Sequence, residues 1–245
     1  MNLNSILILG ASSEISKAVA MKFAENNFDI MLAGRNVMTL MDEKEKISRN
    51  FNIKVTLHEL DITQFNKYED FISSLPFLPT VVLCSIGNLL NQKDCEIDIN
   101  KIKSTFETNF IGPSILLNSI ANLFEERKSG TIIGISSVAG DRGRSSNYFY
   151  GSSKAGFTTF LSGLRNRLSK KNVHVITVIP GYVKTKMIKN IKTPNFLTAK
   201  PIDVGNLIYN SYKTQKNVIY ILPIWKFIML VVRCIPEFIF KKMSF

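Results

Sequence analysis

Seven short apolar runs rich in β-branched residues recur along this chain, and stretches with helical periodicity separate them. The runs span residues 5–9, 29–33, 54–60, 80–85, 131–136, 173–179 and 218–222. Most of them are nearly continuous in hydrophobicity rather than alternating, as expected for strands of a parallel sheet that is covered on both faces. This pattern predicts a doubly wound α/β fold, with a seven-stranded parallel sheet and helices on both faces.

The segments between these runs have the periodicity of helices that pack one face on a sheet. Residues 15–25, 39–49, 102–124 and 149–168 are the predicted helices, and Gly112-Pro113 should bend the third of them. No repeat, low-complexity tract or Gly/Pro/Ser-rich linker divides the chain, which is 45% hydrophobic and 20% charged. The sequence therefore predicts one domain over residues 1–245, with ligands at the carboxyl ends of its strands.

The chain is basic, with 31 Lys and Arg against 19 Asp and Glu and a formal charge of +12. Such a balance favours an anionic partner: nucleic acid, anionic lipid or a phosphorylated substrate. Because no Cys/His finger and no basic region with heptads occurs, we expect no nucleic-acid partner. The cysteines, Cys84, Cys95 and Cys234, are odd in number and widely spaced, so we expect no disulfide framework and no metal site. With no secretory signal at residues 1–9, a cytoplasmic location is expected.

The first strand runs into a turn of small residues, Gly10-Ala11-Ser12-Ser13, and then into Glu14-Ile15-Ser16 and a helix. In a Rossmann fold, the diphosphate of a dinucleotide meets a helix N-terminus at this place. Gly10 allows a sharp turn, and Ser12 and Ser13 offer hydroxyl and amide groups to phosphate. Because only one of the three usual glycines is present, a serine-capped helix after a buried strand remains an alternative.

The end of the second strand discriminates between NAD and NADP. An acidic residue there would bind the ribose 2′-hydroxyl of NAD, but this strand ends in Ala33-Gly34-Arg35-Asn36. Arg35 can pair with a 2′-phosphate, which favours NADPH, with NAD as the alternative and a solvated Arg35 as the competing interpretation. Asp61-Ile62 and Gly87 follow the next two strands, where Asp61 would bind the adenine amino group or cap the following helix.

Tyr150 and Lys154 are the most telling pair in the sequence. Residues four apart share a helix face, so the Lys154 ammonium should lie beside the Tyr150 phenol and lower its pKa towards neutrality. Ser137, at the end of the fifth run, would hydrogen-bond a carbonyl oxygen. Tyr148 has Ser152 four residues later instead of a cation, and it predicts no such chemistry. A Tyr-x-x-x-Lys pattern alone also occurs on amphipathic surface helices.

Over nearly its whole length the chain resembles the short-chain dehydrogenases/reductases. The matching motifs, in order, are Gly10 to Ile15, Asp61-Ile62, Gly87, Asn109 within Glu107-Thr108-Asn109-Phe110, Ser137, Tyr150 with Lys154, and Pro180-Gly181-Tyr182-Val183-Lys184-Thr185. The chain departs from the family where Glu14 and Ser16 replace glycines of the turn. This departure puts the diphosphate geometry in question, but not the chemistry.

The resemblance implies an NAD(P)-dependent oxidoreductase in which Tyr150 is the general acid for ketone reduction and Ser137 orients the carbonyl. Lys154 would bind the nicotinamide ribose, and Asn109 would hold a water that links Lys154 to solvent. Val183 and Thr185 would meet the carboxamide of the nicotinamide. The implied cofactor site comprises Gly10, Ser12, Ser13, Glu14, Ile15, Arg35, Asp61, Ile62, Gly87, Tyr150, Lys154, Pro180, Val183 and Thr185.

A narrower resemblance rests on Ser13-Glu14-Ile15, on residues 140–147 and on residues 233–242. These segments resemble the keto-sugar reductase subunits of decaprenylphosphoryl-ribose epimerases. The implied reaction reduces a polyprenyl-phosphate-linked 2-keto-pentose to the arabinose form, after oxidation by a flavoenzyme partner, in cell-envelope polysaccharide synthesis. A soluble reductase of acyl, steroid or other small ketones is the alternative, and a cofactor-binding sensor without turnover is a third interpretation.

Two basic segments border the expected substrate entrance. Arg142 and Arg144 lie between Ser137 and Tyr150, and four lysines occur in a substrate-side loop over residues 184–200. These lysines are Lys184, Lys186, Lys189 and Lys192. Such cations would hold a substrate phosphate, or they would simply be solvated.

The C-terminal tail, residues 224–245, is apolar and basic and is predicted to be helical. Lys226, Arg233, Glu237 and Lys241 interrupt its apolar residues too often for a bilayer span. One interpretation is peripheral contact with the inner membrane surface, where a lipid-linked substrate would be found. The other is a helix packed on the core or in a homo-oligomer.

Overall fold

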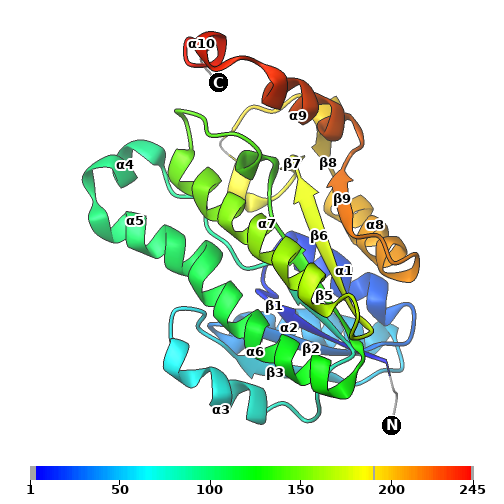
Figure 1. The fold of residues 1–245 in the computed structure, drawn as a ribbon. Coiled ribbons are helices and arrows are strands. Elements are labelled where there is room, and N and C mark those ends of the chain that lie inside the picture. Colours follow the sequence, from blue (N-terminus) through cyan, green and yellow to red (C-terminus); the bar gives the residue numbers. More distant parts are fainter. Residues whose placement is uncertain (1–3, 190, 244–245) are drawn as a thin grey trace.

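The computed structural model describes residues 4–189 and 191–243, and its main feature is a seven-stranded parallel sheet (Figure 1). Its strands are β1 (Ser5–Leu9), β2 (Asp29–Gly34), β3 (Val55–Glu59), β4 (Val81–Cys84), β5 (Gly130–Ile135), β6 (Val173–Pro180) and β9 (Val218–Ile221). The strand order is β3-β2-β1-β4-β5-β6-β9. It changes direction between β1 and β4, which is where doubly wound sheets bind ligands. The predicted fold class is confirmed.

Helices cover both faces of this sheet (Figure 1). One layer contains α1 (Glu14–Ala24), α2 (Met41–Asn50) and α8 (Pro201–Lys213); the other contains α3 (Tyr68–Ser73), α6 (Gly112–Arg127) and α7 (Tyr148–Leu168). The strands send alternate side chains into the two layers. In β1, for example, Ile6 and Ile8 join the α1 layer, whereas Leu7 and Leu9 join the α7 layer. Both sets are buried, which explains why the runs are apolar throughout.

The single helix predicted over residues 102–124 is interrupted. After α4 (Gln92–Ile97), α5 (Ile99–Phe106) leads into a π-helical turn over Glu107–Ile111, and α6 begins at Gly112. The interruption therefore precedes Gly112-Pro113 instead of falling on it. It places Asn109 in the widened turn, a position that often redirects a functional side chain.

The C-terminal third adds elements beyond the main sheet. β7 (Tyr182–Val183) pairs with β8 (Thr198–Ala199), and the substrate-side loop lies between them. The predicted helical tail comprises α9 (Ile224–Cys234) and α10 (Glu237–Phe240). Figure 1 shows both helices, in red, at the end of the molecule to which β6 points. Within residues 4–189 and 191–243, no helix is long and apolar enough to cross a bilayer.

Candidate active site

Serine hydroxyl groups hold the turn after β1. Gly10 has a φ of 83°, which favours glycine. The Ser13 side chain caps α1 by accepting a hydrogen bond from the Ser16 N–H at 3.0 Å. The buried Ser16 hydroxyl donates to the Gly10 carbonyl at 2.9 Å. Ser16, which replaces a family glycine, thus closes the turn from inside. Ser13 caps α1, as the alternative interpretation of this segment predicted.

Glu14, the other departure from the glycine pattern, contacts the substrate-side loop. Its Oε1 accepts a hydrogen bond from the backbone N–H of Lys186 at 3.1 Å. Lys186 begins a short 3₁₀ turn over Lys186–Ile188. The carboxylate therefore joins the first turn of α1 to the loop that follows β7.

A cavity of about 350 Å³ opens at the carboxyl ends of β1 to β4. Seven predicted cofactor residues line it: Gly10, Ser12, Ser13, Arg35, Asp61, Ile62 and Gly87. The other predicted cofactor residues lie outside its lining: Glu14, Ile15, Tyr150, Lys154, Pro180, Val183 and Thr185. Asn88, Ser104 and Thr108 also line the cavity, and sequence reasoning missed them. The only signal for Asn88 was its place one residue after Gly87.

Arg35 and Asp61 lie together at this cavity, and Arg35 is exposed. Asp61 Oδ1 accepts hydrogen bonds from the backbone N–H and the hydroxyl of Thr63, at 3.0 and 2.8 Å. These bonds, led by the backbone N–H and aided by the charge of Arg35, hold the pKa of Asp61 below its usual value. Asp61 thus closes a local turn with Thr63 instead of capping the helix over Phe65–Lys67, and it also lines the cavity.

Ser137, Tyr150 and Lys154 come together where β5 ends and α7 passes over it. The Ser137 side chain is hydrogen-bonded to Tyr150. Lys154 is buried one helical turn beyond Tyr150, and its Nζ donates to the Ile135 carbonyl at 3.1 Å. That Nζ lies 6.0 Å from the centre of the Tyr150 ring. The spacing in the sequence therefore does bring the ammonium beside the phenol.

Burial governs the proton affinity of both groups. It raises the pKa of Tyr150 against the opposing effect of the Ser137 hydrogen bond, and it lowers the pKa of Lys154 to about 8. The prediction that the pKa of Tyr150 moves towards neutrality is therefore wrong for this structure, because desolvation of the phenol raises that pKa and only the Ser137 hydrogen bond opposes it. A raised pKa keeps the Tyr150 phenol protonated at neutral pH, which is the form that a proton donor requires.

Asn109 is fixed beside Lys154 by three hydrogen bonds. Its Oδ1 accepts from the Asn88 N–H at 2.7 Å, and its Nδ2 donates to the Asn88 carbonyl at 3.0 Å and to Ser153 Oγ at 3.2 Å. A β-carbon added to Gly87 would lie 3.2 Å from Lys154 Nζ and 3.3 Å from Asn109 Oδ1. Both side chains therefore converge on the backbone of Gly87, at the edge of the cavity.

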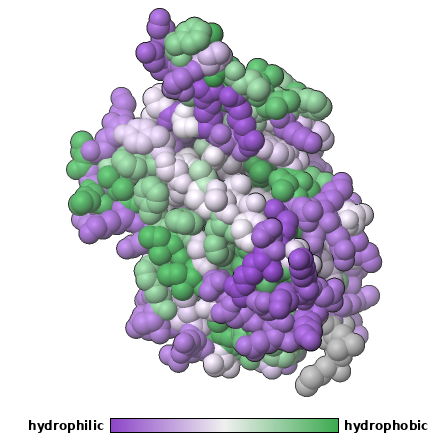
Figure 2. Space-filling model, viewed as in Figure 1, coloured by the Kyte–Doolittle hydropathy of each residue, from purple (hydrophilic) through white to green (hydrophobic). Residues whose placement is uncertain are grey.

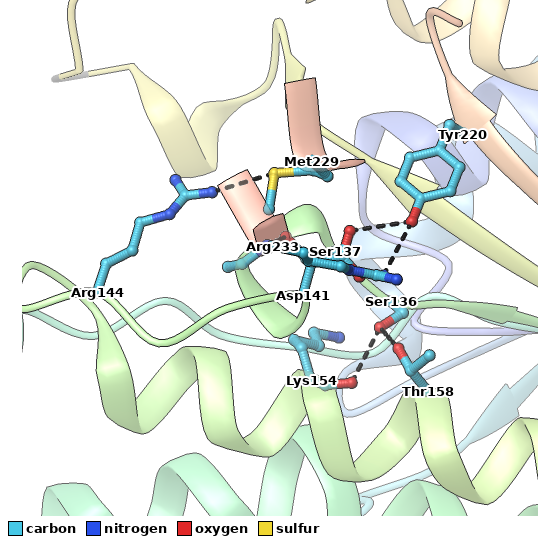
Figure 3. A network of polar contacts seen from close by, with 10 residues as sticks. Ser136, Ser137, Asp141, Arg144, Lys154, Thr158, Tyr220, Met229 and Arg233 are labelled. Atoms are coloured by element: carbon cyan, nitrogen blue, oxygen red, sulfur yellow. Dashed lines mark hydrogen bonds and ion pairs between the residues drawn. The ribbon is translucent and has the colours of Figure 1, made fainter. Parts of the chain in front are cut away.

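The segment after β6 contacts the first turn of α1 through Lys186 and Glu14. Pro180 ends β6, Val183 is buried in β7, and Thr185 precedes the 3₁₀ turn that Glu14 holds. The loop lysines Lys184, Lys186, Lys189 and Lys192 are exposed. Arg142 differs from the expectation of a solvated or phosphate-binding cation, because its guanidinium binds carbonyl groups at the end of α9. Arg144 also turns towards α9, with its Nη2 3.5 Å from Met229 Sδ (Figure 3).

Comparison with known proteins identifies the family of this chain. The sequence profile of the short chain dehydrogenase family matches residues 4–195, which include Ser137, Tyr150 and Lys154. The chain belongs to the short-chain dehydrogenase family. Members of this family are NAD(P)-dependent oxidoreductases, and this chain is one of them.

Relatives and solved structures support the family assignment over most of the chain. An uncharacterized oxidoreductase of Mycobacterium tuberculosis is 28% identical over 242 residues, covering 97% of this chain and 96% of the relative. An uncharacterized oxidoreductase of Staphylococcus aureus is 25% identical over 86% of this chain and 92% of its own length. A short chain dehydrogenase of Burkholderia cenocepacia in complex with NADP has a TM-score of 0.83 at 18% identity, covering 99% of this chain and 98% of that chain. A short-chain dehydrogenase of Sphingobium yanoikuyae in complex with NADPH has a TM-score of 0.81 at 19% identity, covering 96% and 97%.

The residues around the cavity of this short-chain dehydrogenase fit a dinucleotide. Gly10 forms the sharp turn after β1, which brings the N-terminus of α1 to the cavity, where a helix can bind phosphate. Arg35 supplies a cation beside β2, and Gly87 leaves the backbone bare next to Lys154. The same cavity edge could thus hold a diphosphate and a further phosphate close to the predicted catalytic lysine.

Proposed function

We propose that this chain reduces a ketone to a secondary alcohol with NADPH. One observation carries the proposal: Ser137, Tyr150 and Lys154 meet at the end of β5, with Asn109 held behind Lys154 at the cavity edge. A tyrosine with a raised pKa, a hydrogen-bonded serine and a buried lysine are the groups that polarise and protonate a carbonyl oxygen.

Each side chain has a distinct step in the proposed reaction. The bound dinucleotide supplies the hydride that reduces the carbonyl carbon. The Ser137 hydroxyl donates a hydrogen bond to the carbonyl oxygen and fixes its position. Tyr150 Oη transfers its proton to that oxygen, and the Lys154 ammonium stabilises the phenolate that remains. Asn109 holds the backbone at Asn88 beside Lys154, where a water would return a proton to the site.

NADPH is the proposed cofactor, with NAD as the alternative. The support comes from Arg35 at the cavity and from the absence of an acidic residue at the end of β2. The Burkholderia and Sphingobium structures carry NADP and NADPH, which agrees with this choice for proteins of the same fold.

For the substrate, we propose a keto sugar linked to a polyprenyl phosphate, of the 2-keto-pentose to arabinose type, with a flavoenzyme oxidase as partner. Support comes from the surface beside the site. Lys184, Lys186 and Lys189 are exposed on the loop after β7, where they can meet a phosphate diester. A reductase of small acyl or steroid ketones is the second candidate, and the engagement of Arg142 with α9 favours it by removing one expected phosphate ligand.

The tail supports a location on the cytoplasmic face of the inner membrane. Phe227, Leu230 and Phe238 are exposed, although α9 buries Trp225 and Met229 on its opposite side. Figure 2 shows apolar side chains at the upper right and top of the molecule, over α9 and α10. Lys226, Lys241 and Lys242 are exposed nearby, as in interfacial helices that bind anionic lipid. A homo-oligomer contact through the same face is the competing arrangement.

A comparison of substrates tests this function. The oxidation of NADPH is followed with a polyprenyl-phosphate-linked 2-keto-pentose, with the same sugar as a simple phosphate, and with acetoacetyl and steroid ketones. We expect the lipid-linked sugar to have the highest kcat/KM. Equal or better turnover of the small ketones would establish the second candidate, and no turnover of any ketone would reject the reductase itself.

A further inference from the structure

The loop over residues 138–147, between Ser137 and Tyr150, is bound to the C-terminal tail through Asp141. Asp141 accepts a hydrogen bond from the Tyr220 hydroxyl at 3.0 Å and forms an ion pair with Arg233 at the end of α9 (Figure 3). The Asp141 side chain is almost completely buried, whereas Arg233 is half exposed. The pair therefore ties the segment that follows Ser137 to both β9 and α9.

Arg142 extends the same connection to the end of α9 and to α10. Its Nη1 donates to the carbonyl groups of Val232 and Ile235, both at 2.6 Å. These carbonyl groups lie at the C-terminal end of α9, where they have no hydrogen-bond donor within the helix. Its Nη2 pairs with Glu237 at 2.9 Å, and the guanidinium lies 3.7 Å from the centre of the Phe240 ring. Only 14% of the Arg142 side chain is exposed. One arginine thus closes α9 and holds α10 in place.

The buried face of α9 contacts two further segments of the substrate side. Trp225 Nε1 donates to the Leu197 carbonyl at 3.1 Å, within the substrate-side loop. The Trp225 ring lies against Gly181, where a β-carbon would come within 2.0 Å of it, so this position has room only for glycine. Met229 is buried with Val138, the residue after Ser137. The tail therefore contacts the segments after β5 and β6 that border the site.

These contacts bear on Ser137 because its hydroxyl acts only from one position. Ser137 Oγ accepts a hydrogen bond from the Ala139 N–H at 3.1 Å and is also bonded to Tyr150. Asp141 and Arg142 come two and three residues after Ala139, and side chains or carbonyl groups of the tail bind both of them. A tail that lifts away would release this short turn and the side chain that it orients.

We propose that Asp141 and Arg142 are positioning residues that couple the seating of the α9–α10 tail to the placement of Ser137. The tail is then a wall of the active site, and whatever binds its exposed face also acts on the Ser137–Tyr150 hydrogen bond. The inference rests on the proposed function only for the catalytic role of Ser137.

Trp225 is the only tryptophan of the chain and reports on the tail directly. The full-length protein, Arg142→Met and Arg233→Met are compared by acrylamide quenching of Trp225, by hydrogen exchange of peptides covering residues 137–147, and by NADPH affinity. Arg167→Met is the matched control, because Arg167 also makes several side-chain hydrogen bonds, to Glu125, Asn118 and Asn122, away from the tail. Arg233 is half exposed, so its variant remains informative if Arg142→Met fails to fold.

For both tail variants we expect stronger quenching of Trp225 and about tenfold faster exchange in residues 137–147, with NADPH affinity within about twofold of wild type. Arg167→Met should change neither signal. With a ketone that the wild type reduces, both tail variants should have a lower kcat than the wild type. The conservative Arg142→Lys should recover part of the kcat that Arg142→Met loses. Unchanged exchange in residues 137–147 when Trp225 becomes accessible would overturn the coupling. A wild type that binds NADPH but reduces no ketone would instead reject the proposed function.

Discussion

The dinucleotide cavity and the wall formed by α9 and α10 lie at the same end of the sheet, but contacts of different range build them. At the cavity, Gly10 and Arg35 directly follow a strand and Asp61 comes two residues after one, so the strands fix where these residues lie. At the wall, Arg142 binds carbonyl groups 90 and 93 positions further along the chain. Local motifs in the sequence therefore indicate the chemistry of this protein. Contacts between residues far apart in the sequence determine which molecules reach the site of that chemistry.

Substitution of Tyr150 gives the largest expected effect and tests the motif-built region. Tyr150→Phe should lower turnover by at least about 10²-fold because the proton donor is lost, while NADPH binding stays nearly intact. Tyr148→Phe is the control. The Tyr148 hydroxyl is directed to Glu96 at 3.3 Å, so its loss should be mild. Steady-state rates that fall equally in both variants would show that the acid is misassigned.

Substitution of Arg35 tests the cofactor region of the cavity. Arg35→Ala should remove a charged hydrogen bond to the 2′-phosphate, worth roughly 1.5 to 3 kcal/mol, or about 10- to 100-fold in NADPH affinity. NADH affinity should change little. Arg49→Ala, at an exposed arginine on α2 that pairs with Glu45, is the control. Fluorescence titration measures the affinity of each variant for NADPH and for NADH. Equal losses of affinity for the two nucleotides in Arg35→Ala would show that Arg35 does not bind the 2′-phosphate.

The pH dependence of reduction tests the electrostatics of the catalytic region. Because burial lowers the pKa of Lys154 to about 8, its ammonium is present below that pH and lost above it. Burial also raises the pKa of Tyr150, so the phenol stays protonated through this range. We expect kcat/KM for ketone reduction to fall about tenfold per unit above pH 8. A profile that stays flat to pH 10 would mean that the charge of Lys154 is not required.

The smallest expected effect concerns the exposed face of the tail. Lys226→Gln should weaken binding to anionic vesicles by about 1 kcal/mol, or roughly fivefold, because one attraction to the headgroups is lost. Lys170→Gln, on an exposed lysine after α7, should leave vesicle binding unchanged. Flotation with anionic and neutral vesicles measures both variants. A wild type that stays in solution with anionic vesicles would favour the oligomer contact.

The sheet was predictable from sequence because burial on both faces leaves a continuous apolar run for each strand. Six of the predicted runs differ from the observed strands by one residue or two, and β1 matches at both ends. The interruption at Glu107–Ile111 was not predictable in its position, since Gly112-Pro113 is the stronger helix-breaking signal. The β7–β8 pair is two residues long on each side and leaves no periodicity to detect.

The candidate site was predictable where function depends on spacing within one element. Tyr150 and Lys154 are an example, because one helix carries both. The pKa of Tyr150 was not predictable, since burial of the phenol raises it and burial is a tertiary property. The role of Arg142 was not predictable for a related reason. A charged loop residue is usually solvated, and only the fold brings the carbonyl groups of the tail within reach of its guanidinium.

The transfer of deuterium from labelled NADPH tests the central claim most directly. NADPH deuterated at C4, on either face, is incubated with the lipid-linked keto sugar and wild-type protein, and the product is examined by mass spectrometry. The account predicts that one face delivers deuterium to the former carbonyl carbon, and that Tyr150→Phe slows this transfer while Tyr148→Phe does not. Alcohol that forms without deuterium from either face, or full transfer by Tyr150→Phe, would contradict it.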